Sequence, residues 1–273
     1  MKTESPWADW IGRQASAVQY ISPEPLAALA ATLDMEPPAQ GAPLPICGHW
    51  VYFASCVRAS QLGLDGHPRL GDLMPPSPLP RRMFAASRIE RLAPMHPGET
   101  IRKTTRIASV IEKNGKSGKL LFVELENVYS RDGDYLLREN QTIVYRGEQE
   151  LEPTATSNSD LLENWDGESL TITPDPVLLF RFSALTFNSH RIHYDHDYAC
   201  NVEGYRGLVV QGPLIATLLA NRVQGQPKRF TFKAVAPAFC NDPLTLQSVG
   251  SESVQLRAIR SDGRMVMQAE AGH

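Results

Sequence analysis

The residues of this chain that are best suited to do chemistry lie between positions 182 and 221. Asn188 and His193 stand five residues apart after an apolar run, and a Gln-Gly-Pro sequence follows at 211–213. An imidazole can exchange a proton with water near neutral pH, and an amide can orient that water. Gly212 opens an apolar stretch with helical periodicity, and free N–H groups at a helix start can hold a developing oxyanion. Together these residues are candidate parts of a site that activates water.

Each of the three residues also has a purely structural interpretation. His193 could cap a turn or helix that begins at Asp195, a favoured residue type for the cap itself. Asn188 could be a turn residue after a predicted strand at 177–186, since asparagine favours turns. Gly212 could be a loop glycine before a core helix, in which Pro213 suits the first position. The residues alone leave both interpretations open.

Further histidines and aspartates crowd the same segment, so a metal site is an alternative. The set consists of His190, His193, His196, Asp195 and Asp197. Imidazole and carboxylate groups are ligands of zinc and iron. On one helix the three histidines would fall partly on one face, but this part of the chain is expected to turn after a strand. We therefore predict that the site holds no metal.

Four arginines are the best candidate anchors for an acidic substrate: Arg81, Arg82, Arg191 and Arg206. Guanidinium groups offer a bidentate fork for phosphate or carboxylate. Arg81 and Arg82 follow a proline-rich run at 65–80, which cannot hold regular structure because proline fixes φ and removes a donor. Long ordered loops often border sites. The alternative for each arginine is a solvated surface position.

Composition points to a soluble protein with a small-molecule partner. The 273 residues, 42% of them hydrophobic, allow one large domain or two of ordinary size. A net charge of -3 and a pI near 6.2 argue against nucleic-acid and membrane-surface binding. Four scattered cysteines indicate reduced thiols, and the polar N-terminus lacks the apolar core of a secretory signal, so we expect a cytoplasmic location. No apolar run is long enough for a membrane span, and no Walker, GxGxxG, GxSxG or HExxH pattern occurs.

The predicted elements form two similar halves. The first half has a helix at 23–33, a second helix or, given its aromatic content, a strand at 48–60, the proline-rich loop, and strands at 83–92, 99–113, 119–130 and 135–146. Turn residues at 114–118 and 131–134 predict antiparallel hairpins. A polar connector at 148–166 leads to the second half, with the strand at 177–186, a helix at 213–222, and strands at 229–236, 244–251, 254–261 and 265–271. This order predicts an α+β protein with antiparallel sheets.

The order of the candidate residues resembles the signature of the R-specific enoyl-CoA hydratases, the MaoC-like or hydratase 2 proteins of the hot-dog fold. In that family an aspartate and a histidine five residues apart activate water. His193 matches the family histidine, while Asn188 stands where the family usually has its aspartate. An amide cannot take a proton at neutral pH, so the resemblance leaves the acid–base role largely to His193. Gly212 matches the glycine of the family's His-Gly pair, and Gln211 replaces the histidine of that pair.

The runs TFNSHRIHYD and PLPRRM are most similar to the mesaconyl-CoA and itaconyl-CoA hydratases and the mitochondrial 3-hydroxyacyl thioester dehydratases. The resemblance implies a double hot dog, with two central helices each wrapped by a curved antiparallel sheet. Its N-terminal half at 1–150 would bind substrate and CoA, and its C-terminal half at 151–273 would carry the hydratase motif.

The same resemblance implies a cofactor-free hydro-lyase that adds water to itaconyl-CoA or mesaconyl-CoA and yields citramalyl-CoA. Alternatives are a dehydratase of longer 3-hydroxyacyl-ACP or 3-hydroxyacyl-CoA chains, a hot-dog thioesterase, and a non-catalytic acyl-CoA binder. Exposed strand edges of such a fold would allow a homodimer, with a monomer as the alternative.

Overall fold

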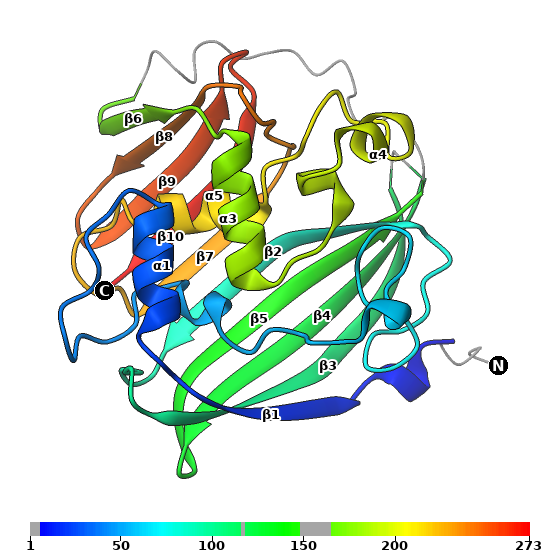
Figure 1. Cartoon of the computed structure of the whole chain (residues 1–273), viewed down its shortest axis with the longest axis horizontal. Helices are drawn as coiled ribbons and strands as arrows, with labels where there is room; N and C mark the ends of the chain where they lie inside the picture. The colour runs from blue at the N-terminus through cyan, green and yellow to red at the C-terminus, as the bar shows by residue number, and fades with distance from the viewer. Residues whose placement is uncertain (1–5, 116–117, 148–164) are drawn as a thin grey trace.

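All ten strands of the protein form one antiparallel sheet in a computed structural model that describes residues 6–115, 118–147 and 165–273. The strand order is β1-β3-β4-β5-β2-β7-β10-β9-β8-β6. The sheet curves around the helices, which lie on its concave side (Figure 1). No helix within the described ranges is long and apolar enough to cross a membrane.

The sheet is built from two halves with the same topology. The first half comprises β1 (Gln14–Tyr20), β2 (Arg81–Arg91), β3 (Thr100–Gly115), β4 (Gly118–Arg131) and β5 (Asp134–Arg146). The second comprises β6 (Glu168–Ile172), β7 (Arg229–Ala234), β8 (Leu244–Val249), β9 (Ser253–Arg260) and β10 (Met265–Gly272). Reading outward from the centre, β2-β5-β4-β3-β1 repeats as β7-β10-β9-β8-β6. The halves join where β2 pairs with β7 in antiparallel register.

The predicted strands of both halves are confirmed, apart from the one at 177–186. In β4 buried residues alternate with partly exposed ones, as expected for a strand with one face on the core. Asp132 and Gly133 both have positive φ, 51° and 96°, which matches the twist of a tight hairpin between β4 and β5. The predicted boundary at residue 150, most of the connector and the centre of the turn at 114–118 lie outside the described residues.

Residues 177–186 form a helix, so the predicted strand there is wrong. Helix α3 (Pro176–Thr186) begins with Pro176 at its first position, and the Asp175 carboxylate caps it by accepting from the Leu178 N–H at 2.7 Å. Leu179 and Phe182, three residues apart on one helical face, are buried in the main core. A short apolar run does not distinguish helix from strand, and capping together with packing decides here.

The predicted helix at 23–33 is present as α1 (Glu24–Thr32), and the one at 213–222 as α5 (Gly212–Ala220). Helix α5 contacts β7, β8, β9, β10 and β2, so it occupies the centre of the C-terminal half. Neither the helix nor the strand considered for 48–60 forms. The first residues of this segment form only a 3-10 turn, η2 (Gly48–Val51), because the backbone is left-handed at Cys47 and becomes extended at Tyr52.

A buried carboxylate holds this shortened segment against the sheet. Glu139 of β5 accepts hydrogen bonds from His49 Nε2 at 3.1 Å, Trp50 Nε1 at 3.0 Å and Ser87 Oγ at 2.8 Å. Burial by itself would raise the pKa of Glu139, but the charge of the His49 imidazole, hydrogen bonds from His49 and Gln141, and the Lys103 ammonium lower the pKa to about 2. The carboxylate is therefore ionised and fixes the η2 segment, including Trp50, which lines the cavity described next.

Candidate active site

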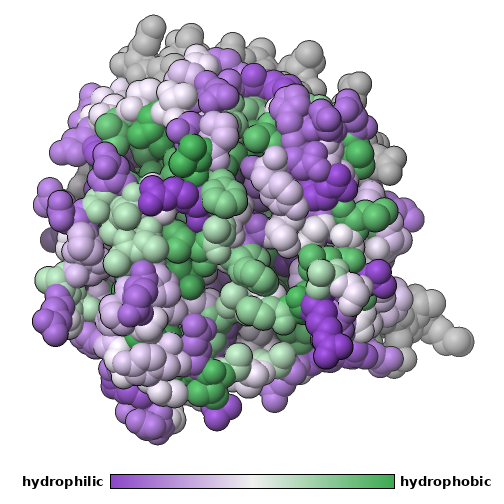
Figure 2. All heavy atoms as spheres, in the orientation of Figure 1, coloured by the Kyte–Doolittle hydropathy of each residue, from purple (hydrophilic) through white to green (hydrophobic). Residues whose placement is uncertain are grey.

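A cavity of about 1360 Å³ lies between the two halves of the chain. The N-terminal half contributes the loop at 55–74 and the start of β2, and the C-terminal half contributes α3, the turn after it, and the start of α5. On the face of the molecule seen in Figure 1 and Figure 2, apolar side chains gather across the middle, with hydrophilic residues around them. A concave, mostly apolar wall with a few polar groups is typical of small-molecule sites.

His193 lies in the turn after α3, at the end of the 3-10 helix η4 (Arg191–His193). Its Nδ1 atom is 2.7 Å from the carbonyl oxygen of Val209. A carbonyl only accepts, so Nδ1 carries the proton and Nε2 keeps its lone pair. Burial, reinforced by the neighbouring His190, lowers the pKa of His193 to about 3. The ring is therefore neutral at pH 7 and can accept a hydrogen bond from water.

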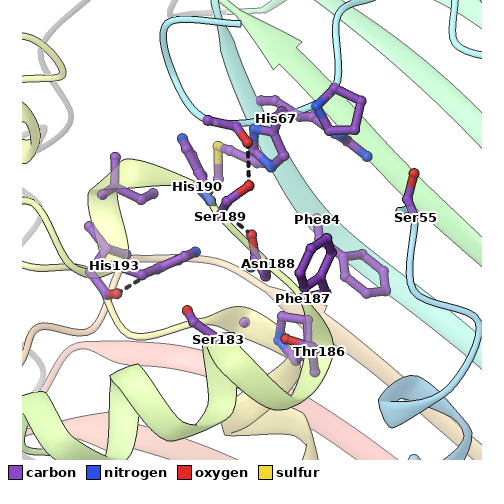
Figure 3. Close-up of a pocket in the computed structure, with 18 of the residues that line it drawn as sticks. Ser55, His67, Phe84, Ser183, Thr186, Phe187, Asn188, Ser189, His190 and His193 are labelled. Atoms are coloured by element: carbon purple, nitrogen blue, oxygen red, sulfur yellow. Dashed lines mark hydrogen bonds between the residues drawn. The ribbon is translucent and has the colours of Figure 1, made fainter. Parts of the chain in front are cut away.

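Asn188 lines the same cavity, but its side chain also shapes the turn. Its Oδ1 accepts from the His190 N–H at 3.1 Å (Figure 3), and its backbone N–H donates to the carbonyl oxygen of Ser183 at 2.8 Å. Phe187, just before it, has φ of 51° and ends α3. Asn188 is therefore both a turn residue and a residue of the cavity wall.

Gly212 lines the cavity as the first residue of α5, and the following Pro213 has no N–H. The first N–H groups of a helix lack intrahelical partners, so the Gly212 N–H can bind an anion. Gln211, just before it, is fully buried and donates from Nε2 to Leu179 O and Ser183 Oγ, both at 2.9 Å. Gln211 therefore ties the start of α5 to α3.

Of the four predicted anchors, Arg82 lines the cavity. Arg69, in the proline-rich loop, lines it too, and the sequence prediction missed it. Arg81, the neighbour of Arg82 in β2, is buried at 7% exposure. Successive residues of a strand face opposite sides of the sheet, so two adjacent arginines cannot both reach one cavity in the same way.

Arg191 and Arg206 have partners elsewhere. Arg191 pairs with Asp195 at 2.7 Å and lies over the Tyr198 ring, and Arg206 pairs with Asp242. Neither is among the described residues that line the cavity. The structure thus brings Arg82, and not these two, to the candidate site.

Sequence reasoning also missed two residues of the proline-rich loop. His67 Nδ1 lies 2.9 Å from Asp65 Oδ2, and the His67 ring packs on His190 with centroids 4.2 Å apart. His190 in turn contacts His193 with centroids 5.4 Å apart, and its Nε2 lies 3.2 Å from Glu203 Oε1. The only signal in the sequence was the Asp-Gly-His run in a loop expected to border a site.

The metal-ligand set proposed from sequence is not assembled. His196 and Asp197 have side chains that are 66% and 93% exposed and do not line the cavity. Asp65, His67 and His190 instead place ligand atoms within 4.8 Å of one another, and this trio could hold a divalent ion. Each of the three already has a hydrogen-bond partner within the protein.

The repeated strand order of the two halves and the helices on the concave side of the sheet define an α+β double hot dog. A MaoC-like dehydratase aligns over 97% of this chain and 98% of its own with a TM-score of 0.72 at 12% identity. HtdX of Mycobacterium tuberculosis aligns over 95% and 99% with a TM-score of 0.68 at 18% identity. The predicted fold is confirmed.

The chain belongs to the hydroxyacyl-thioester dehydratase type 2 family, whose model matches residues 47–240. It is 40% identical to the mesaconyl-C(4)-CoA hydratase of Chloroflexus aurantiacus over 96% of both chains. It is 26% identical to the mitochondrial hydroxyacyl-thioester dehydratase type 2 of Schizosaccharomyces pombe, over 72% of this chain and 75% of that one. The protein is thus a hydratase or dehydratase of CoA thioesters.

Proposed function

We propose that the protein adds water to a short dicarboxylic enoyl-CoA, mesaconyl-CoA or itaconyl-CoA, and forms citramalyl-CoA. The observation that carries this proposal is one cavity that joins His193 and Gly212 to Arg82. The relative that is 40% identical over nearly the whole chain is named for mesaconyl-C(4)-CoA, which supports the same substrate class.

The chemistry follows from the atoms that face the cavity. His193 holds a water molecule through its Nε2 lone pair, and the water oxygen bonds to the β-carbon of the enoyl thioester. The electrons of the double bond move to the thioester oxygen, where the Gly212 N–H stabilises the enolate. The water proton passes to a neutral imidazole of the cavity wall and from there to the α-carbon, so no outside acid or base is consumed.

Arg82 is the group that would distinguish a dicarboxylic substrate. Most of the cavity wall is apolar, with Phe84, Phe187 and Ile215 among its residues. A free carboxylate in such surroundings needs a cationic partner, and arginine meets it with two parallel hydrogen bonds. Arg69 stands on the same wall as a second cation for the substrate or its CoA phosphates.

A second candidate function is dehydration of longer 3-hydroxyacyl-ACP or 3-hydroxyacyl-CoA chains. The volume of about 1360 Å³ and the mostly apolar wall leave room for a longer acyl chain. The same catalytic groups would serve, and Arg82 would then have no carboxylate to bind. Thioester hydrolysis and acyl-CoA binding without chemistry are further outcomes of the test below.

The test follows the enoyl-thioester absorbance with mesaconyl-CoA, itaconyl-CoA and crotonyl-CoA, with products identified by mass. We expect hydration of a dicarboxylic thioester, loss of activity in His193→Ala, and a KM at least tenfold higher in Arg82→Gln for the dicarboxylic substrate alone. Arg88→Gln, an exposed arginine of the same strand, is the matched control and should match the wild type. Turnover of crotonyl-CoA alone would refute the dicarboxylic assignment, and free CoA would indicate a thioesterase.

We also propose a cytoplasmic homodimer. Its support is the sheet itself, whose edge strands β1 and β6 are largely exposed and carry Val18, Tyr20 and Leu170 on their surface. Light scattering during gel filtration tests the assembly, and a mass of one chain would refute it. Cell fractionation tests the location.

A further inference from the structure

The loop that carries Asp65 and His67 is fixed on the turn at 188–193, which holds Asn188 and His193 and is called the catalytic turn below. The Arg191 N–H donates to Asp65 O at 2.9 Å, and the Ser189 hydroxyl donates to Gly66 O at 2.5 Å. Gly66 has φ of +90°, and a Cβ there would lie 1.9 Å from Ser189 O. Glycine is therefore required at this contact, because any larger residue would push the two segments apart.

Asp65 orients His67 with both carboxylate oxygens. Oδ1 accepts from the His67 backbone N–H at 3.0 Å, and Oδ2 lies 2.9 Å from the ring Nδ1. An ionised carboxylate only accepts, so Nδ1 carries the proton and Nε2 keeps a lone pair. The His67 ring lines the cavity and packs on His190, which contacts His193 (Figure 3). The pair thus has the arrangement of a general base held by a carboxylate.

The Asp65–His67 pair supplies a base held by a carboxylate, which the segment around Asn188 and His193 lacks. Asn188 cannot take a proton. The ring of His193 is backed by the neutral carbonyl of Val209, which stabilises a positive imidazole less than a carboxylate does. We propose that His67, held by Asp65, is a catalytic residue that accepts a proton of the attacking water and delivers it to the α-carbon, while His193 holds that water by accepting its other O–H. This inference rests on the proposed hydration reaction.

The step balances within the cavity. The O–H bond of water breaks as its oxygen bonds to the β-carbon, and the proton moves to His67 Nε2 while the electrons reach the thioester oxygen. The enolate then collapses, and the new C–H bond at the α-carbon takes the proton back from Nε2. His67 ends neutral, with Asp65 still ionised.

The surroundings of His67, burial first among them, keep its ring neutral at pH 7. Burial lowers the pKa of His67 to about 4, with help from Arg82 of β2 and from His190, while Asp65 opposes the shift. Burial raises the pKa of Asp65, but the hydrogen bonds from His67 bring the pKa below its ordinary value. At pH 7 the pair is a carboxylate and a neutral imidazole.

The experiment uses the thioester that the wild-type protein hydrates fastest, so an error in the dicarboxylic assignment does not affect it. We expect kcat to fall by about 10²–10⁴-fold in His67→Gln and at least tenfold in Asp65→Asn, with KM changed less than threefold. His67→Ala should recover at least tenfold when imidazole is added, which a merely structural role would not show. His196→Gln, an exposed histidine nearby, is the control.

The outcomes separate the competing explanations. A kcat of His67→Gln within threefold of the wild type would overturn the proposal. A stoichiometric divalent metal in the purified protein, with activity lost to a chelator and restored by zinc, would also overturn it and make His67 a ligand. If the wild type hydrates none of the thioesters and dehydrates none of their products, the proposed function fails and this inference fails with it. Retained unfolding midpoints show that the variants are folded.

Discussion

Replacing Gly66 by alanine tests whether the loop must lie against the catalytic turn. The added Cβ would lie 1.9 Å from Ser189 O, while real Cβ contacts are essentially never under 3.0 Å. The two segments must therefore separate by at least about 1.1 Å, the difference between these distances. A misplacement of about 1 Å can cost roughly 100-fold in rate. We expect a loss of that size in kcat/KM for Gly66→Ala.

Gly12→Ala is the matched control for backbone strain. Gly12 has the same φ of +90°, and its added Cβ would meet no atom within 4 Å. Left-handed backbone costs an alanine about 1–2 kcal/mol, so Gly12→Ala should lose that much in urea unfolding and Gly66→Ala should lose more, because its two segments also separate. Only Gly66→Ala should lose activity in the thioester assay. If the kcat/KM values of the two variants agree within threefold, the docked loop does not position a catalytic group and the reasoning is wrong.

Two further predictions concern buried titratable groups. In Glu139→Gln, urea unfolding should show a loss on the order of 3 kcal/mol at pH 7, the equivalent of a pKa lowered from 4.5 to about 2. This stability is present above pH 4.5 and lost as the pH falls toward 2, so a wild-type and variant difference that persists at pH 2 would contradict the account. The kcat/KM of the wild type should stay flat between pH 5 and 8 and fall below about pH 4, because His67 and His193 have pKa values of about 4 and 3 and lose their lone pairs only there. An inflection near pH 6.5 would show that these rings are more solvated than the structure indicates.

Local signals in the sequence were sufficient for eight of the ten described strands and for the start of α5, but they missed the edge strands β1 and β6. These signals act through backbone geometry over a few residues. They are strand-forming runs whose residues alternate in burial, turn residues such as Asp132-Gly133, and the Gly-Pro pair at 212–213. For the same reason the segment around His193 could be recognised as a candidate site. The types and spacing of its residues indicate a site that activates water, and this can be inferred without knowing the fold of the rest of the chain.

The tertiary structure decided what depends on packing between distant segments. The apolar run of α3 was compatible with strand or helix until its cap and its burial against the core settled the matter. Strand geometry placed Arg82 on the cavity wall and its neighbour Arg81 in the protein interior.

The contact of the loop with the catalytic turn was equally beyond the sequence. Ser189 and Gly66 are 123 positions apart, and local propensity holds no information on such a contact. By itself the sequence determined a hydratase-like segment that lacks its carboxylate. Only the docking of the two halves brought Asp65 and His67 to that segment, because their position depends on hydrogen bonds and steric fit across the cavity.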